Sequence, residues 1–170
     1  MDVSLGLRSW KWRATDWAAA AVSGFAAGAV LMVLDLVWSG IFNPGGPWRT
    51  SHMIAPVFLG FDTLHATGYA FNAAVVGVAL AIHYFMGTLF GLVAGWVLAQ
   101  LDLETTPMHA GAAGAVLGVL LYLFNFHFVV VAFLPWLAEL VGGEALGAHV
   151  VFGAATGLLY WRLNRIPPEQ

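Results

Sequence analysis

The 170-residue sequence has no cysteine and very little charge. Without cysteine, the chain itself cannot form disulfides, thiolate metal sites or cysteine-ligated iron–sulfur clusters. Charged residues make up 9% of the sequence, against about 25% in a typical soluble protein. This is too few to cover a soluble globule of this size. Lysine occurs only at Lys11 and the net charge is −3, so no basic stripe is present for a nucleic-acid partner.

Apolar residues are abundant: 61% of the sequence is hydrophobic and the mean hydropathy is +0.83. A helix needs about 20 apolar residues to cross a bilayer. Four runs approach or exceed this length, and none shows an obvious break: residues 17–42, 72–100, 110–134 and 145–163. We therefore expect an all-α integral membrane four-helix bundle, with residues 1–170 forming a single transmembrane domain.

Basic residues indicate how these spans are oriented, because lysine and arginine near span ends favour the cytoplasmic side. Five of the six basic residues precede the first run or follow the fourth: Arg8, Lys11, Arg13, Arg162 and Arg165. Only Arg49 lies in a predicted outer loop. With an even number of spans, this places both termini in the cytoplasm, as in a multi-pass protein of the bacterial inner membrane.

The sequence also contains an internal repeat. The run from Ala26 to Leu34 resembles the run from Ala112 to Leu120 at an offset of 86 residues. A Pro-Trp pair follows in each half, and each second span carries the pattern His-x-x-x-Gly-x-x-x-Gly-Leu, beginning at His83 and at His149. These matches predict two tandem two-helix repeats, about residues 17–100 and 108–165, related by a pseudo-twofold axis along the membrane normal.

Glycines recur three or four residues apart on all four predicted spans. Residues at this spacing share one helix face, and small side chains there let two backbones approach closely. We expect eight of them to pack helices together: Gly24, Gly28, Gly87, Gly91, Gly114, Gly118, Gly153 and Gly157.

Polar residues within the spans gather at similar depths in the outer half of the membrane: Asp35, His83, Asn125, His127 and His149. Such groups are costly in lipid unless they are paired or hydrated. Asp35, Asn125 and His127 are interpreted first as members of a structural hydrogen-bonded layer. His83 and His149 are also candidate axial ligands of a haem b, since the pseudo-twofold makes them equivalent. A third interpretation is a proton or cation path, and a copper or zinc site is a further alternative.

The long outer loop contains an apolar segment, residues 51–60, that is too short to span the membrane. We expect it to form a short interfacial helix. His52 and His65 flank this segment and are expected to be hydrated surface imidazoles.

Several of these segments together resemble a family of small, four-span bacterial inner-membrane proteins, largely uncharacterised, some of which are labelled sodium/proline-symporter-like. The resembling residues are Met53-Ile54-Ala55, His83-Tyr84-Phe85, Leu121 to Phe126, Phe133 to Trp136 and His149 to Gly153. The resemblance implies the four-span architecture. It does not imply symport, because sodium-coupled amino-acid carriers use inverted repeats with broken helices.

No nucleotide, phosphate or nucleophile motif is present in the sequence. We therefore expect a non-catalytic subunit that packs against other transmembrane helices, either in a self-oligomer or as an accessory part of a larger assembly such as an electron-transfer complex. The alternatives are a haem b-binding membrane protein and a small proton, cation or solute carrier. The expected partners are the lipid bilayer and other membrane subunits, with no nucleic acid, no required cofactor and no dedicated metal site.

Overall fold

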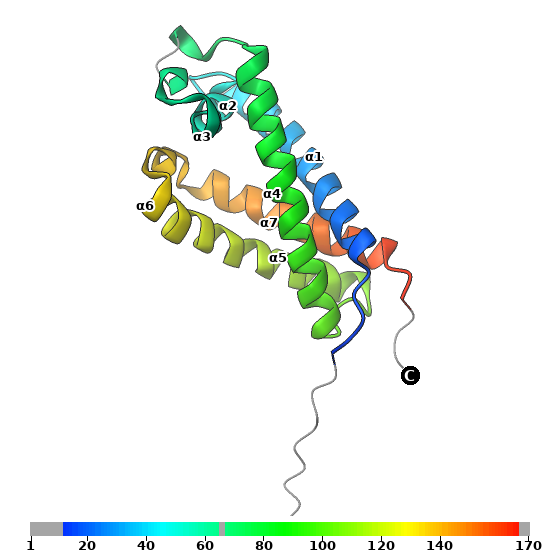
Figure 1. Cartoon of the computed structure of the whole chain (residues 1–170). Coiled ribbons are helices and arrows are strands. Elements are labelled where there is room, and N and C mark those ends of the chain that lie inside the picture. Colours follow the sequence, from blue (N-terminus) through cyan, green and yellow to red (C-terminus); the bar gives the residue numbers. More distant parts are fainter. Residues whose placement is uncertain (1–11, 65–66, 167–170) are drawn as a thin grey trace, which may run out of the picture.

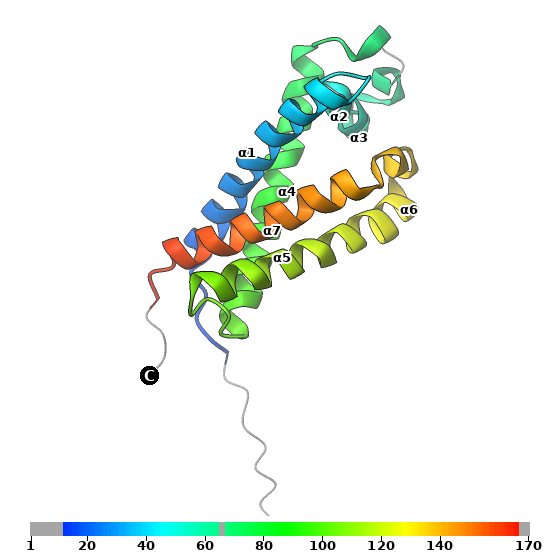
Figure 2. The same cartoon turned by 180° about the vertical axis from the view of Figure 1, so that it is seen from behind.

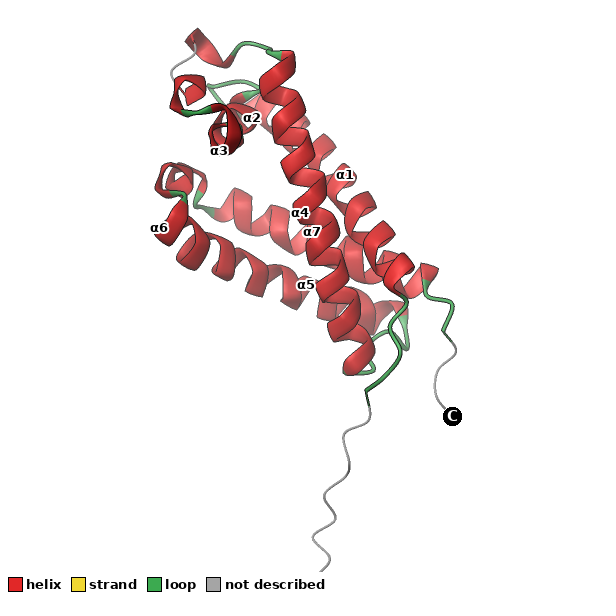
Figure 3. Cartoon of the chain, viewed as in Figure 1, coloured by secondary structure: helices red, strands yellow, loops and turns green. Residues whose placement is uncertain are grey.

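The computed structural model describes residues 12–64 and 67–166, and this part of the chain is helical without any strand (Figure 3). Three long apolar helices or continuous helical segments are suited to crossing a membrane: α1 (Trp17–Phe42), α4 (Ala73–Gln100) and the continuous segment Pro107–Phe133. The last of these comprises α5 (Pro107–Phe124), the π-helical segment η3 (Asn125–Val129) and α6 (Val130–Phe133). These findings identify a helical membrane protein.

A fourth long helix, α7 (Gly143–Leu163), runs beside α5. The remaining elements are short. The loop between α1 and α4 contains α2 (Arg49–Ile54), α3 (Pro56–Leu59), η1 (Phe61–Leu64) and η2 (Thr67–Tyr69), and η4 (Pro135–Leu140) precedes α7. The loop expected to hold one short helix at residues 51–60 thus contains several consecutive short helices, of which α2 and α3 cover most of that segment.

Polar side chains at the helix starts explain where three of the long helices begin. Asp16 accepts a hydrogen bond from the Ala19 amide at the start of α1 (2.9 Å). Asn72 accepts bonds from two amides of the first turn of α4, and Thr106 accepts one from the His109 amide in α5. Each cap satisfies backbone donors that the first helical turn leaves free.

The long helices form two hairpins. α1 packs against α4, α5 packs against α7, and the hairpins meet mainly through α1 and α7. Figures 1 and 2 show them close together at the end that carries both the α4–α5 loop and the C-terminal end of α7, and diverging toward α2, α3 and α6. The molecule is therefore V-shaped.

Glycines lie at the closest approaches within each hairpin. A Cβ atom added to Gly24 of α1 would lie 2.6 Å from Gly91 Cα of α4. A Cβ atom on Gly153 of α7 would lie 2.8 Å from the Gly118 nitrogen of α5. Gly28, Gly87, Gly114 and Gly157 lie along the same contacts. The glycine faces are thus occupied by helices of this same chain.

At the closed end of the V, Tyr160 of α7 is fully buried with Ala19, Ala20 and Leu98. At the open end, the two hairpins are bridged at the outer loops. Trp136 Nε1 donates a hydrogen bond to the Met53 carbonyl (3.0 Å), and the Arg49 guanidinium pairs with Glu139 (3.0 Å). These contacts join α2 to η4 across the mouth.

Candidate functional site

The polar residues of the spans occupy three separate places in the fold. The first is the α5–α7 hairpin, where the His149 Nδ1 lies 2.7 Å from the Ala145 carbonyl and its Nε2 lies 3.3 Å from the Asn125 amide nitrogen. These partners match one neutral tautomer, in which Nδ1–H donates to Ala145 and Nε2 accepts from Asn125. The rings of Tyr122 and Phe126 pack edge-on against this imidazole.

The π-helical segment determines which residues of this region face α7. A π turn contains more residues than an α turn, so it shifts the faces on which the following side chains lie. Asn125 is half-buried and Phe126 is buried, while His127 is exposed. His127 makes an edge contact with Tyr122 but no hydrogen bond among the described residues. The chain stays helical through this π turn, so the third apolar run is continuous from Pro107 to Phe133, as expected.

The second place is the α1–α4 hairpin. His83 Nε2 lies 2.9 Å from the Gly28 carbonyl of α1, and this contact requires an Nε2–H donor. On an adjacent surface of the same hairpin, Tyr84 stacks on Phe25 with 4.6 Å between ring centroids.

The third place is the C-terminal end of α1. The Asp35 side chain is half-buried, and its Oδ1 lies 3.3 Å from the Thr50 hydroxyl of α2. Ser39, one helical turn beyond Asp35, is 1% exposed, and its hydroxyl interacts weakly with the Asp35 carboxyl but makes no hydrogen bond of normal geometry in the described structure. His83 and Glu144 lie within electrostatic range of the Asp35 carboxyl. Together these residues form a small oxygen-rich cluster beneath α2: Asp35, Ser39 and Thr50.

The five polar residues expected to share one layer are thus only partly brought together. A direct hydrogen bond joins Asn125 to His149. His83 and Asp35 instead bond to Gly28 and Thr50. His127 lies on an exposed surface.

A haem does not fit this arrangement of the two histidines. Each axial ligand must present a free imidazole nitrogen to the iron from opposite sides of a porphyrin. Both nitrogens of His149 are engaged within the α5–α7 hairpin, and His83 is bonded into the α1–α4 hairpin. In the described ranges there is also no cluster of three or more histidine and acidic side chains that could hold a metal ion.

His52 was expected to be hydrated, and the structure corrects this expectation. The side chain is 1% exposed, with Nδ1 at 2.9 Å from the Thr63 carbonyl and Nε2 at 2.9 Å from the Ala70 carbonyl. The imidazole therefore connects α2 to the two ends of the segment that leads into α4. His65 lies outside the described residues.

The end of the molecule opposite α2 has its own polar contacts. Arg13 pairs with Asp102 (2.7 Å), and its backbone exchanges two hydrogen bonds with the Gln100 side chain. Bonds from the Ala19 and Arg165 amides, with the Arg165 charge, hold the pKa of Asp16 below its ordinary value. Burial raises the pKa of Glu104, whose Oε2 atom is buried without a partner in the described structure. These groups fasten the chain end before α1 to the α4–α5 loop and to the end of α7.

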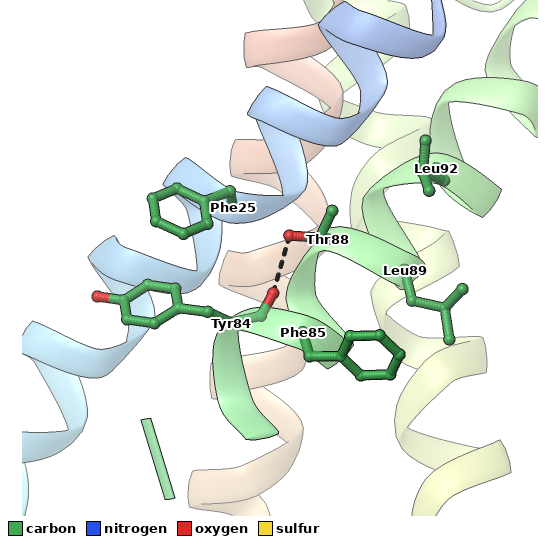
Figure 4. A pocket seen from close by; sticks show the side chains of 6 residues that line it. All are labelled: Phe25, Tyr84, Phe85, Thr88, Leu89 and Leu92. Carbon is green, nitrogen blue, oxygen red and sulfur yellow. Dashed lines mark hydrogen bonds between the residues drawn. The ribbon is translucent and has the colours of Figure 1, made fainter. Parts of the chain in front are cut away.

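An open apolar hollow of about 310 Å³ lies on the α1–α4 surface (Figure 4). Its lining residues are Phe25, Tyr84, Phe85, Thr88, Leu89 and Leu92. The Thr88 hydroxyl already donates to the Tyr84 carbonyl (2.8 Å). The hollow is therefore suited to an apolar chain rather than to a polar ligand.

Sequence reasoning missed Ser39 and Thr50, and it assigned His52 to the hydrated surface although its side chain is buried. Ser39 lies four residues after Asp35, and residues at that spacing share a helix face. The sequence spacing could therefore have identified Ser39 as a neighbour of Asp35. Thr50 and His52 had none, because their positions depend on how the outer loop folds back.

Comparison with protein-family models, curated proteins and solved structures gives no match to this chain.

Proposed function

We propose that this protein is a non-catalytic, four-span subunit of the bacterial inner membrane that packs against other transmembrane helices in a larger assembly. The observation that carries the proposal is the exposed imidazole of His127 within an apolar helix surface. His127 lies six residues before the end of the third apolar segment, or about 9 Å along the helix axis. An exposed polar side chain at that depth is costly in lipid and favours a polar partner.

The surface around His127 has the composition of a helix-docking face. Large exposed apolar side chains surround the imidazole on α5, η3 and α6: Leu120, Phe124, Phe128, Val131 and Phe133. Shape-matched apolar packing with one polar contact is a common way for spans to associate. The expected partner is a transmembrane helix that carries a carboxylate, amide or hydroxyl group in the outer half of the membrane.

The four-span topology in this proposal depends on α7. Its 21 residues correspond to about 31 Å of helix, close to the thickness of the hydrocarbon core. Its close packing along α5 and Arg162 in its last turn favour a span that ends on the cytoplasmic side. Arg13 before α1 favours the same side for the other end, so both termini are assigned to the cytoplasm.

The tandem repeat is also part of the proposal. Two hairpins with glycine contacts, α1–α4 and α5–α7, are what a duplicated two-helix unit would produce. The glycine faces do not themselves support external partners, because they are filled within the chain. An external partner is therefore supported by the His127 surface rather than by the glycines.

The proposal is tested by His127→Leu at native expression level, with His109→Leu as the matched control. His109 is an exposed histidine at the opposite end of the same apolar segment. Membranes are solubilised in a mild detergent, and the size and composition of the species containing the chain are measured. We expect wild type and His109→Leu to co-purify with stoichiometric membrane subunits or further copies of the chain, and His127→Leu to lose them. A lone monomer in all three samples would contradict the proposal.

A further inference from the structure

We propose that the outer end of α1 contains a binding site for a small monovalent metal cation, formed by the Asp35 carboxylate and the hydroxyl groups of Ser39 and Thr50. This inference is independent of the assembly proposed above. It depends on the oxygen-rich cluster beneath α2, which none of the internal contacts of the fold fully satisfies.

The first argument is the environment of Asp35. The residue lies seven positions before the end of α1, or about 10 Å along the helix axis, and is half-buried. It forms no ion pair with any residue in the described ranges. A carboxylate at this depth requires a counter-charge or a proton.

The second argument is the hydroxyl of Ser39. The residue is 1% exposed, and its Oγ atom interacts only weakly with the Asp35 carboxyl, without a hydrogen bond of normal geometry to any described residue. Ser23, a buried serine on the same helix, donates to the Ala19 carbonyl at 2.6 Å. A buried hydroxyl without a well-formed hydrogen bond costs free energy, and Ser39 lies one helical turn from Asp35. Its oxygen is thus available as a neutral ligand at the carboxylate.

The third argument is the length of the Asp35–Thr50 contact. The two oxygens are 3.3 Å apart, whereas a hydroxyl donating to a carboxylate normally lies at about 2.5–2.7 Å. Thr50 therefore stabilises the carboxylate weakly in this geometry. Two oxygens at this separation are suitably placed to contact the same ion.

The ligand chemistry selects the class of ion. One carboxylate and two hydroxyls supply hard oxygen ligands and a single negative charge. Calcium and magnesium sites commonly use more carboxylates or bound phosphates, and transition metals prefer imidazole or thiolate ligands. A singly charged alkali-metal ion matches both the charge and the donor type.

The surrounding charges favour a cation. Glu144, at the start of α7, is a second acidic group within electrostatic range of Asp35 and favours a cation, whereas the His83 imidazole, also within range, adds no negative charge. The basic residue next to Thr50 is Arg49, and its guanidinium is engaged by Glu139 at 3.0 Å. Arg49 therefore does not act as the counter-ion that Asp35 lacks.

The experiment measures the melting temperature (Tm) of the purified full-length protein in detergent, in sodium, lithium, potassium or choline chloride at one ionic strength and pH. A ligand at about 100 times its Kd would raise the Tm by roughly 5–10 °C for a chain of this size. We expect at least one alkali cation to raise the wild-type Tm above its value in choline, and radioactive sodium or rubidium to bind at one ion per chain. A wild-type protein with neither response would overturn the proposal.

Variants then locate the response. Asp35→Asn and Ser39→Ala should abolish the cation-dependent Tm shift, and Thr50→Val should reduce it. Ser23→Ala is the matched control, because it removes a buried hydroxyl of α1 whose partner is a backbone carbonyl, and it should keep the full shift. An unchanged shift in Asp35→Asn or Ser39→Ala would place the ion elsewhere and overturn the assignment.

Asp35 could instead be neutralised by a proton, and the same data separate this outcome. A protonated carboxyl predicts that Asp35→Asn equals or exceeds wild type in stability in choline, with no alkali-cation response in either protein. That result would reject the cation site. It would leave the assembly test at His127 unaffected, because that test uses a different surface.

Discussion

At the scale of single residues, the histidines have distinct roles that follow from the hydrogen-bond partners of their ring nitrogens. His149 has one acceptor and one donor as partners, which matches a neutral ring. His52 faces two carbonyl oxygens, one at each ring nitrogen. His83 uses a single nitrogen, bonded to Gly28. The surroundings of a histidine, rather than its position in a span, therefore determine its chemistry.

Glu104 allows a residue-scale test of the closed end of the V. Burial raises its pKa above the ordinary value of 4.5, so the fold favours the protonated carboxyl and loses stability as pH rises through the raised pKa. We expect Glu104→Gln to stabilise the protein at neutral pH by at most about 1 kcal/mol, because partial solvent contact screens the charge.

The measurement is thermal unfolding of both proteins across the pH range. The stability difference should disappear below pH 4.5, where the native carboxyl is also neutral. Asp102→Asn is the control, and it should be destabilising at neutral pH, since it breaks the ion pair with Arg13. Destabilisation by Glu104→Gln at neutral pH would mean that the carboxylate has a favourable partner.

At the scale of elements, the long apolar helices were readily predictable from the sequence. The first run was predicted at residues 17–42, and α1 has these bounds. The second was predicted from residue 72, which is the N-cap of α4. Uninterrupted hydropathy and polar caps are local signals, so a single sequence contains them. The π-helical segment has no such signal, because its register depends on packing against α7.

The glycine contact between α5 and α7 supplies an element-scale prediction. A methyl group on Gly153 would collide with the backbone at Gly118, whereas one on Gly147 of the same helix would meet nothing within 4 Å. Overpacking of this kind typically costs about 1–3 kcal/mol. Gly153→Ala should therefore lower the Tm in detergent and expose the α5–α7 contact to solvent. Gly147→Ala should have a Tm equal to or above that of wild type. Equal Tm values for the two variants would argue against this contact.

At the scale of the whole molecule, sequence reasoning anticipated the apolar helices but not how the candidate site is formed. The histidine repeat suggested that His83 and His149 face a common axis, yet each histidine is bonded within its own hairpin. The oxygen-rich cluster needs α2 to fold back over α1. That arrangement depends on long-range contacts such as His52 with Ala70 and Trp136 with Met53, and hydropathy carries no information about them.

The V shape itself gives the last prediction. The hairpins diverge toward α2 and α6 (Figure 1), and their open ends are joined by the Trp136–Met53 hydrogen bond and the Arg49–Glu139 ion pair. If these contacts limit how far the two hairpins diverge, Trp136→Phe combined with Arg49→Gln should increase the mean distance between the two outer loops and broaden its distribution.

Spin labels can measure this distance directly, because the chain has no native cysteine to compete for the label. We place cysteines at exposed Phe58 of α3 and Val141 after η4, and a second pair at exposed Thr105 and Arg162 near the closed end. The double substitution should change the first distance and leave the second unchanged, since the core around Tyr160 holds the closed end. An unaltered outer distance would show that packing between α1 and α7 alone determines the angle between the hairpins.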